Sequence, residues 1–324
     1  MRSLQSRITI LLAALTMAVG FAACGSDSDG GDDGGAPATA EITEITIEAN
    51  GFVFDALAAG PADGEPVMLL HGFPQTAWEW EHQLSALGAA GYRAVAPNQR
   101  GYSPGARPEA ISDYNIVALV GDVVAMADTL GFERFHLVGH DWGASVTWLA
   151  GLLARDRIAS LVPISVPHID AFSRTLADPD SCQPASSSYF DLFVQPDSED
   201  LFLVDDAALL RSIYDGLTPE QIERHLTVMN SKEALRAGLH WYRANVGATS
   251  GGEGPGIGNT TQPTMYIWSD GDPALCIDGA LLTEEYVDGP YRFEIIEGVN
   301  HWVPELAAEK VSALLLEHLA GLRD

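Results

Sequence analysis

The chain has 324 residues, of which 47% are hydrophobic, and its 17 Lys+Arg against 45 Asp+Glu give a net charge of -28. This length and apolar content suffice for one large core that carries an inserted unit. The negative charge repels phosphate backbones and anionic lipid headgroups, which argues against nucleic acid or a membrane surface as a partner.

The N-terminus is predicted to be an export signal. After Arg2 and Arg7 comes the uncharged run ITILLAALTMAVGFAA, which is short for a membrane-spanning helix and suited to a signal peptide. The run ends in FAAC, so that small residues precede Cys24, as in bacterial lipoprotein signals. We therefore predict a lipoprotein signal peptide over 1–23 and lipidation of Cys24. An ordinary signal peptide with an incidental cysteine is the alternative.

This signal predicts an exported bacterial lipoprotein, at the cell surface or in the periplasm, that meets the membrane only through its N-terminal lipid. Residues 24–40 contain no large apolar side chain and are predicted to be a flexible, acidic and Gly-rich tether. The remaining cysteines, Cys182 and Cys276, are an even pair in an exported protein, where disulfides persist. The sequence leaves open a disulfide between them or two free thiols.

The folded part begins with two segments, 41–49 and 52–60, that alternate apolar and polar residues, as in a half-exposed antiparallel hairpin. Continuous apolar runs then alternate with helical patterns. Such runs are typical of strands buried on both faces of a parallel sheet. The predicted strands are 66–71, 92–98, 134–140 and 160–166, and the predicted helices between them are 78–90, 112–130 with Ser112 as its cap, and 142–154. This alternation predicts a doubly wound α/β fold.

The alternation is interrupted after the strand at 160–166. Residues 167–258 contain helical patterns and aromatic residues but no convincing buried strand, and they end in a Gly-rich stretch. Strands are predicted again at 263–269 and 291–298, followed by a last helix at 304–319. The sequence therefore predicts a core formed by 41–166 and 259–324, into which 167–258 is inserted as a helical cap and linker.

The predicted strand-to-helix junction GHDWG places Asp141 between two glycines, which leave room for a sharp turn. Such a turn projects its central side chain above the sheet, beside a helix N-terminus. An aspartate at a helix start is also a common capping residue, so this motif alone is ambiguous. In HGFP, at the end of an earlier strand, the N–H of Phe73 is predicted to stabilise an oxyanion together with the N–H of Trp142.

Two later strands end in ionisable residues. DGDP supplies Asp270 and Asp272 as competing candidates for one carboxylate role, and NHW supplies His301. Active sites of open α/β sheets form at the carboxyl ends of the strands, so these side chains are expected to meet Asp141. The chain order is nucleophile, acid and histidine, as in the α/β-hydrolase arrangement.

Together, HGFPQTAWEWEHQ, GHDWGA and the late HW resemble the α/β-hydrolase fold, and within it the epoxide hydrolases, over about 41–324. The resemblance implies a mostly parallel eight-stranded sheet with helices on both faces and an inserted helical cap. It implies that Asp141 is the nucleophile and that Asp272 and His301 activate water. It also implies two cap tyrosines, matched by Tyr242 in HWYRAN and Tyr189 in SSSYFDLFVQP, and neither cofactor nor metal.

The chemistry of a carboxylate explains why an aspartate can stand where many hydrolases have serine. With an ordinary pKa near ~4, a carboxylate is already anionic at neutral pH and can displace a leaving group from saturated carbon. The expected reaction is hydrolysis of a hydrophobic epoxide to a vicinal diol through an alkyl-aspartate ester. The residues expected to contact the substrate are Phe73, Trp142, Phe190, Phe193 and Trp241.

Two other functions remain compatible with the sequence. A haloalkane dehalogenase uses the same nucleophile, but its pattern prefers asparagine where this chain has Phe73, and it needs no cap tyrosines. A non-catalytic surface binding protein of the same fold is the third possibility, against which the presence of Asp141, Asp272 and His301 argues. The sequence leaves the oligomeric state open.

Overall fold

The structure is a computed structural model that describes residues 39–246 and 256–323. The predicted signal peptide, Cys24 and nearly all of the predicted tether lie outside the described residues, as does most of the Gly-rich stretch before the late strands. Within the two described ranges, no helix is both long enough and apolar enough to cross a membrane.

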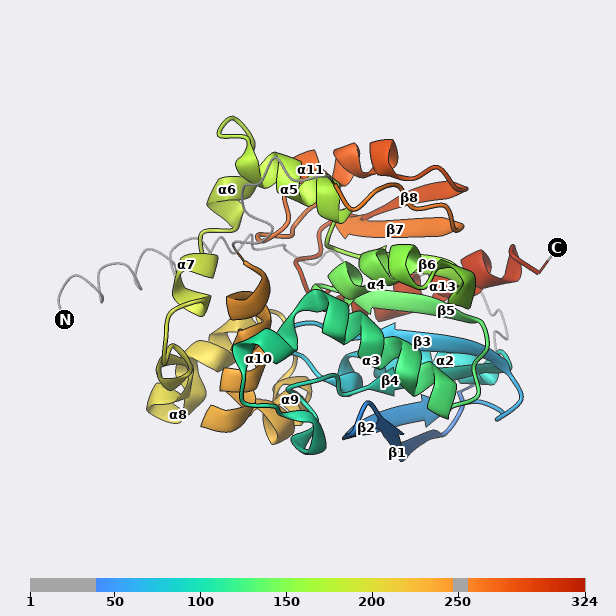
Figure 1. Ribbon diagram of the computed structural model, residues 1–324, viewed down its shortest axis with the longest axis horizontal. Helices are drawn as coiled ribbons and strands as arrows, with labels where there is room; N and C mark the ends of the chain where they lie inside the picture. The colour runs from blue at the N-terminus through green and yellow to red at the C-terminus, as the bar shows by residue number, and fades with distance from the viewer. Residues whose placement is uncertain (1–38, 247–255, 324) are drawn as a thin grey trace, which may run out of the picture. The chain divides into compact units, whose positions relative to one another are not determined.

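The described residues form a mostly parallel eight-stranded sheet in the order β1-β2-β4-β3-β5-β6-β7-β8 (Figure 1). The pairs β1–β2 and β2–β4 are antiparallel, and the other pairs are parallel. This sheet confirms the predicted fold class. The strands are β1 Ile42–Ala49, β2 Phe52–Ala59, β3 Glu65–Leu70, β4 Tyr92–Pro97, β5 Phe135–His140, β6 Ile158–Ile164, β7 Thr264–Ser269 and β8 Tyr291–Ile296.

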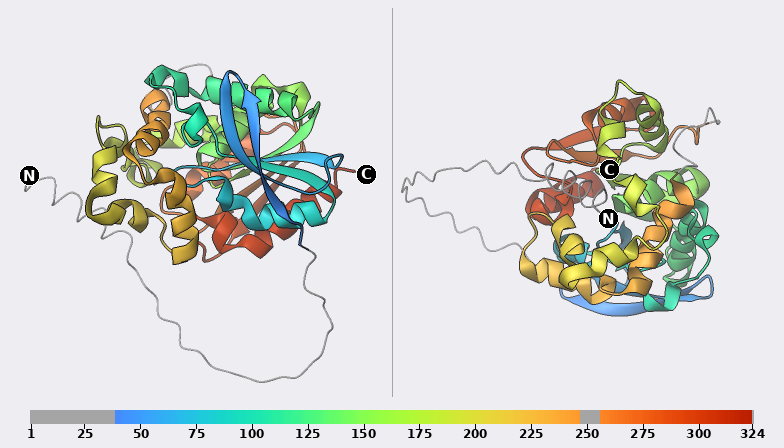
Figure 2. Two further views of the ribbon diagram at one scale, coloured as in Figure 1. Left: turned by 90° about the horizontal axis from the view of Figure 1, so that it is seen from below. Right: turned by 90° about the vertical axis from the view of Figure 1, so that its left-hand side faces the viewer.

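Helices cover both faces of the sheet (Figure 2). Helices α2 (Glu81–Ala89) and α13 (Ala308–Ala320) share one apolar cluster with the side chains of Val67 and Leu69 from β3. Helices α3 (Ile116–Thr129) and α4 (Trp142–Leu153) share the other cluster with Met68 and Leu70. Because successive side chains of a strand point to opposite faces, a continuous apolar run such as that of β3 feeds both clusters.

Two predicted helix boundaries are wrong. Helix α3 is capped by Asn115, whose side chain accepts a hydrogen bond from the N–H of Ala118, whereas Ser112 lies in a separate 3-10 turn. An asparagine oxygen in an extended backbone caps a helix as well as serine does, and it breaks the helix that we predicted to pass through it. The predicted last helix is split at Ala307 (φ -117°, ψ 34°) into α12 (Val303–Leu306) and α13.

Between β6 and β7 the described chain contains helices and no strand. Helix α5 lies beside α11, whereas α7 to α10 gather at one end of the sheet, on the left of Figure 1. The remaining elements are α5 Ile169–Ala177, α6 Gln183–Ser186, α7 Phe190–Phe193, α8 Glu199–Ile213, α9 Pro219–Met229, α10 Lys232–Asn245, α11 Ile277–Leu282, η1 Ala77–Trp80, η2 Pro104–Ala106, η3 Ile111–Tyr114, η4 Arg155–Arg157 and η5 Thr283–Tyr286.

Candidate active site

Asp141 occupies a sharp turn between β5 and α4, with φ 51° and ψ -121°. A positive φ is unfavourable for a residue with a Cβ and persists only where the surrounding structure enforces it. The flanking glycines explain how the turn fits. A Cβ on Gly139 would overlap the main chain of Gly143, and a Cβ on Gly143 would overlap the main chain of Leu70. The GHDWG pattern therefore allows the turn at Asp141 to lie directly against β3.

The loop after β3 contacts the carboxyl group of Asp141. A Cβ on Gly72 would overlap the Asp141 side chain, so only glycine lets the two approach this closely. The next residue, Phe73, donates its main-chain N–H to Asp141 Oδ1 at 2.9 Å. Trp142 is the first residue of α4, where an N–H has no acceptor in its own helix. The two predicted oxyanion donors thus stand beside the enzyme's own carboxylate.

His301 and Asp272 form a hydrogen-bonded pair beside Asp141. His301 Nδ1 lies 2.8 Å from Asp272 Oδ2, and His301 Nε2 lies 3.6 Å from Asp141 Oδ2. The other oxygen of Asp272 accepts the main-chain N–H groups of Ala274 and Leu275. The competing carboxylate, Asp270, is exposed and accepts the N–H of Gly298 instead. The geometry therefore gives the carboxylate role to Asp272.

The charges of this triad support one another. Burial would raise the pKa of Asp141, but the hydrogen bond and charge of His301 lower that pKa below its ordinary value. Burial would lower the pKa of His301, but the carboxylates of Asp272 and Asp141 raise it to about 10. In the resting protein at neutral pH, Asp141 is therefore an anion and His301 an imidazolium.

The two predicted tyrosines approach Asp141 from the helical insertion. Tyr189 immediately precedes α7 and Tyr242 lies in α10, and their ring centroids are 6.3 Å apart. The ring of Tyr242 lies 5.2 Å from that of Trp142 and 5.5 Å from that of Phe73. Burial, followed by the charge of Asp141, raises the pKa of both phenols well above the ordinary value. Both phenols are therefore protonated at neutral pH.

An aromatic cluster surrounds the two phenols. Phe190 and Phe193 lie with their ring centroids 5.7 Å and 4.9 Å from that of Tyr242. Trp241, which we also predicted to contact substrate, is buried, and its indole N–H donates to the carbonyl of Arg100 at 2.8 Å. Its ring stands 6.0 Å from that of the half-buried Trp142, so the structure gives Trp241 a supporting position behind Trp142.

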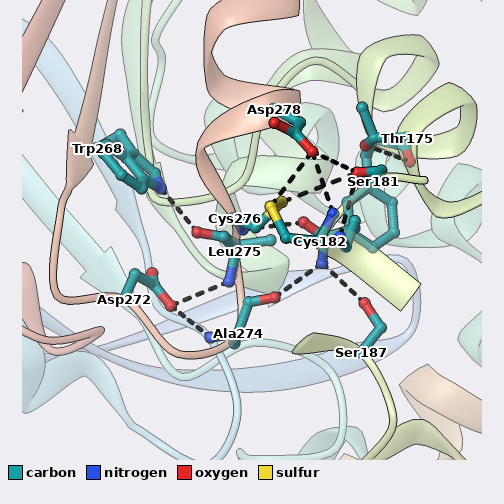
Figure 3. Close-up of a disulfide and its surroundings, with 12 residues drawn as sticks. Thr175, Ser181, Cys182, Ser187, Trp268, Asp272, Ala274, Leu275, Cys276 and Asp278 are labelled. Carbon is teal, nitrogen blue, oxygen red and sulfur yellow. Dashed lines mark hydrogen bonds between the residues drawn. A yellow bond between two sulfur atoms is a disulfide. The ribbon is translucent and has the colours of Figure 1, made fainter. Parts of the chain in front are cut away.

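A disulfide joins Cys182 to Cys276, so the structure resolves the alternative that the sequence left open (Figure 3). Cys182 lies at the start of α6, and Cys276 follows the loop whose N–H groups hold Asp272. Next to the bridge, the Gln183 side chain donates to the carbonyl of Ala274 and accepts the N–H of Cys276. The disulfide thus ties the helical insertion to the loop that orients Asp272.

Removal of this bridge is expected to lower stability. The cysteines are 94 residues apart, so the bridge restricts a long loop in the unfolded chain, and Cys182→Ser should lower the free energy of unfolding by about 2–4 kcal/mol. Urea denaturation of parent and variant measures this difference. Ser181→Ala, at a neighbouring residue, is the matched control. A Cys182→Ser variant as stable as the parent would contradict the prediction.

Several buried polar residues near His301 could not be selected from the sequence. His140 precedes Asp141, and its ring centroid lies 4.7 Å from that of His301. Glu79, Glu305 and His225 are buried nearby and come from three separate elements. His140 lies within the GHDWG motif and Glu79 within WEW, but nothing in the sequence shows that these two side chains are in contact.

Comparison with known proteins places this arrangement in a family. A model of the alpha/beta hydrolase fold matches residues 65–308, and the chain belongs to that family. Epoxide hydrolase A of Mycobacterium tuberculosis (strain ATCC 25618 / H37Rv) is 33% identical, over 86% of this chain and 98% of its own length. AB hydrolase superfamily protein YfhM of Bacillus subtilis (strain 168) is 31% identical, over 84% of this chain and 96% of its own length.

A solved structure also resembles this protein. It comes from a study of novel epoxide hydrolases of the alpha/beta hydrolase superfamily in metagenomes from hot environments, and it matches this chain with a TM-score of 0.78 and 28% sequence identity, over 86% of this chain and 99% of its own length. Within the alpha/beta hydrolases, the protein is therefore a member of the epoxide hydrolase family, as its motifs predicted.

Proposed function

We propose that the protein hydrolyses a hydrophobic epoxide to a vicinal diol through a covalent ester on Asp141. The observation that carries this proposal is the position of Asp141 near two sets of groups. The His301–Asp272 pair lies beside its carboxyl group, and the buried phenols of Tyr189 and Tyr242 lie near enough for its charge to raise their pKa values. An epoxide hydrolase needs both sets, because one must activate water and the other must protonate an alkoxide.

In the first step, the Asp141 carboxylate attacks one carbon of the epoxide, a C–O bond forms and the ring C–O bond breaks. The departing oxygen takes a proton from a phenol of Tyr189 or Tyr242, which leaves a tyrosinate. The low pKa of Asp141 keeps the nucleophile anionic, and the raised pKa of each phenol keeps its proton available. The apolar rings around the two tyrosines suit an epoxide with an apolar substituent.

In the second step, His301 removes a proton from water, and the resulting hydroxide attacks the carbonyl carbon of the ester. The N–H of Phe73, which already contacts Asp141 Oδ1, stabilises the oxyanion together with the N–H of Trp142. Collapse releases the second diol oxygen, which takes the proton from His301. Asp141 is regenerated as an acid, and its proton restores the tyrosinate.

Alkylation prepares His301 for this second step. In the resting protein the Asp141 carboxylate helps to raise the pKa of His301 to about 10, and the imidazolium cannot accept a proton. Ester formation removes the negative charge of Asp141, so the pKa of His301 falls, the imidazolium releases its proton to solvent and the neutral imidazole becomes a base. Once Asp141 is an anion again, His301 takes a proton back from solvent. The nucleophile and the base thus act in sequence.

Turnover of a substrate panel tests the proposal. The purified protein is incubated with styrene oxide, with a linear aliphatic epoxide and with 1-chlorobutane and 1-bromobutane. We expect diol from the epoxides, little halide from the alkyl halides, and no product from an Asp141→Ala variant. Halide release without diol would indicate a dehalogenase, and absence of turnover on every substrate would favour a binding protein.

We also propose, from the sequence alone, that the protein is an exported lipoprotein anchored through Cys24. In a bacterial host, the full-length chain should incorporate a palmitate analogue and fractionate with membranes, whereas Cys24→Ala should do neither. An unlabelled parent chain, or a labelled Cys24→Ala variant, would contradict this proposal.

A further inference from the structure

Glu79, in η1, is buried without the partners that a carboxylate requires. Its exposed fraction is 0%, and among the described residues neither carboxyl oxygen accepts a hydrogen bond of good geometry, although a main-chain hydrogen bond from Gly72 lowers its pKa to a small extent. Among the described residues, its ion-pair contact is with His140, whose Nδ1 lies 2.6 Å from Glu79 Oε1. A buried carboxylate without strong donors or a paired cation is strongly disfavoured, and the group retains its proton instead.

His140 is held on both sides of its ring. Its Nε2 lies 2.9 Å from the main-chain oxygen of His301, which can only accept, so Nε2 must carry a proton. Its Nδ1 faces two oxygens, Glu79 Oε1 and, at 3.1 Å, Gln75 Oε1. A neutral imidazole has a single N–H, and the groups around Nδ1 decide which nitrogen carries that proton.

The two oxygens have opposite effects on the imidazole proton. The amide N–H of Gln75 donates to Glu305, which turns Gln75 Oε1 toward His140 Nδ1. Alone, this oxygen would draw the proton to Nδ1 and leave Nε2 without a hydrogen to donate to His301. A protonated Glu79 donates to Nδ1 and thereby keeps the proton of His140 on Nε2.

The surrounding charges favour this neutral pair. Burial, followed by the charge of Glu305 in α12, raises the pKa of Glu79 well above its ordinary value, and His225 in α9 and a main-chain hydrogen bond from Gly72 oppose this shift. Burial and the neighbouring His301 imidazolium lower the pKa of His140 to about 3. The nearby Asp141 carboxylate raises both pKa values. At pH 7, Glu79 is therefore an uncharged acid and His140 an uncharged imidazole.

We propose that Glu79 is a positioning residue for hydrolysis of the alkyl-enzyme. Its carboxyl proton fixes the tautomer of His140, and His140 Nε2 then holds the main-chain carbonyl of His301. This contact keeps the His301 ring between Asp272 and Asp141. The inference rests on the proposed function, because it assigns Glu79 to the second step of that reaction and to no other.

Comparison of Glu79→Leu with Glu79→Gln tests the role as a neutral donor. Leucine fills the site without donating, so the ester should hydrolyse on the order of 10–100-fold more slowly, while alkylation keeps the parent rate. Alkylated enzyme should then accumulate during turnover, as seen by intact-mass measurement. Glutamine can donate through its amide, so Glu79→Gln should restore hydrolysis to within about 3-fold of the parent.

Glu81→Leu is the matched control, because Glu81 is the next acid in the chain but is partly exposed and paired with Arg224. It should leave both half-reactions at the parent rate. A Glu79→Gln variant as slow as Glu79→Leu would overturn the proposal, because charge and not donation would then matter. Equal losses in alkylation and hydrolysis, or a Glu79→Leu variant at the parent rate, would also overturn it.

A measurement on the parent protein covers the case in which Glu79→Leu does not fold. In protein labelled with 15N-histidine, His140 should show a protonated Nε2 and an unprotonated Nδ1 at neutral pH, with its signals assigned by their loss in His140→Asn. Two protonated nitrogens, or a proton on Nδ1, would overturn the proposal. Absence of any alkylated enzyme in His301→Ala would instead contradict the proposed function.

Discussion

His301→Ala is expected to be alkylated by an epoxide and to remain alkylated. The first step needs only the Asp141 carboxylate and a phenol proton, and alanine at 301 leaves both in place. The second step loses its base, so steady-state turnover should fall by roughly 10²–10⁴-fold. Intact-mass measurement should show a stable adduct with the mass of one epoxide, and peptide mapping should place it on Asp141.

Two comparisons make this result interpretable. Asp141→Ala should give neither adduct nor turnover, which separates alkylation of the nucleophile from alkylation of other carboxylates. In a single turnover of excess parent enzyme in H2(18)O, the diol should carry unlabelled oxygen taken from Asp141. A folded but unmodified His301→Ala variant, or a first-turnover diol labelled with 18O, would contradict the ester mechanism.

Loss of both cap phenols is expected to stop epoxide opening almost completely. An alkoxide leaves saturated carbon only with a proton or a strong hydrogen-bond donor, and the Tyr189 and Tyr242 rings are close enough to serve one oxygen. Each single change to phenylalanine should lower turnover by roughly 10–1000-fold, because the other phenol can still donate. The double variant should form no adduct even when His301 is also replaced, as judged by intact mass.

Phe193→Leu is the control for this series, because it perturbs the same aromatic cluster without removing a hydroxyl. It should change KM more than the rate of ring opening. Parent-like alkylation by the double phenylalanine variant would exclude the phenols as proton donors.

The alkaline limit of ring opening follows from burial of the phenols. An exposed phenol would lose its proton near about pH 10. Burial and the Asp141 charge raise the pKa of Tyr189 and Tyr242 well above that value, so alkylation should continue at the parent rate through pH 10. The rate of adduct formation in His301→Ala, measured against pH, checks this expectation without interference from the second step.

Much of this protein could be predicted from its sequence because the signals are local. A strand that is buried on both faces appears in the sequence as a continuous apolar run. The turn that carries Asp141 requires glycine at 139 and 143, because a Cβ at either position would overlap neighbouring main-chain atoms. One prediction from a local signal, the start of the helix near Ser112, was wrong. The side chains of Ser112 and Asn115 offer similar capping oxygens, and only the backbone of the folded chain shows that the helix starts after Asn115.

Other features were decided only when distant segments came together. The choice between Asp270 and Asp272 depends on which carboxylate faces His301, and the pairing of Cys182 with Cys276 depends on how α6 lies against the loop after β7. The protonation of Glu79 depends on burial and on charges contributed by α9 and α12. Such energies depend on distance and dielectric environment, and a sequence pattern specifies neither until the chain is folded.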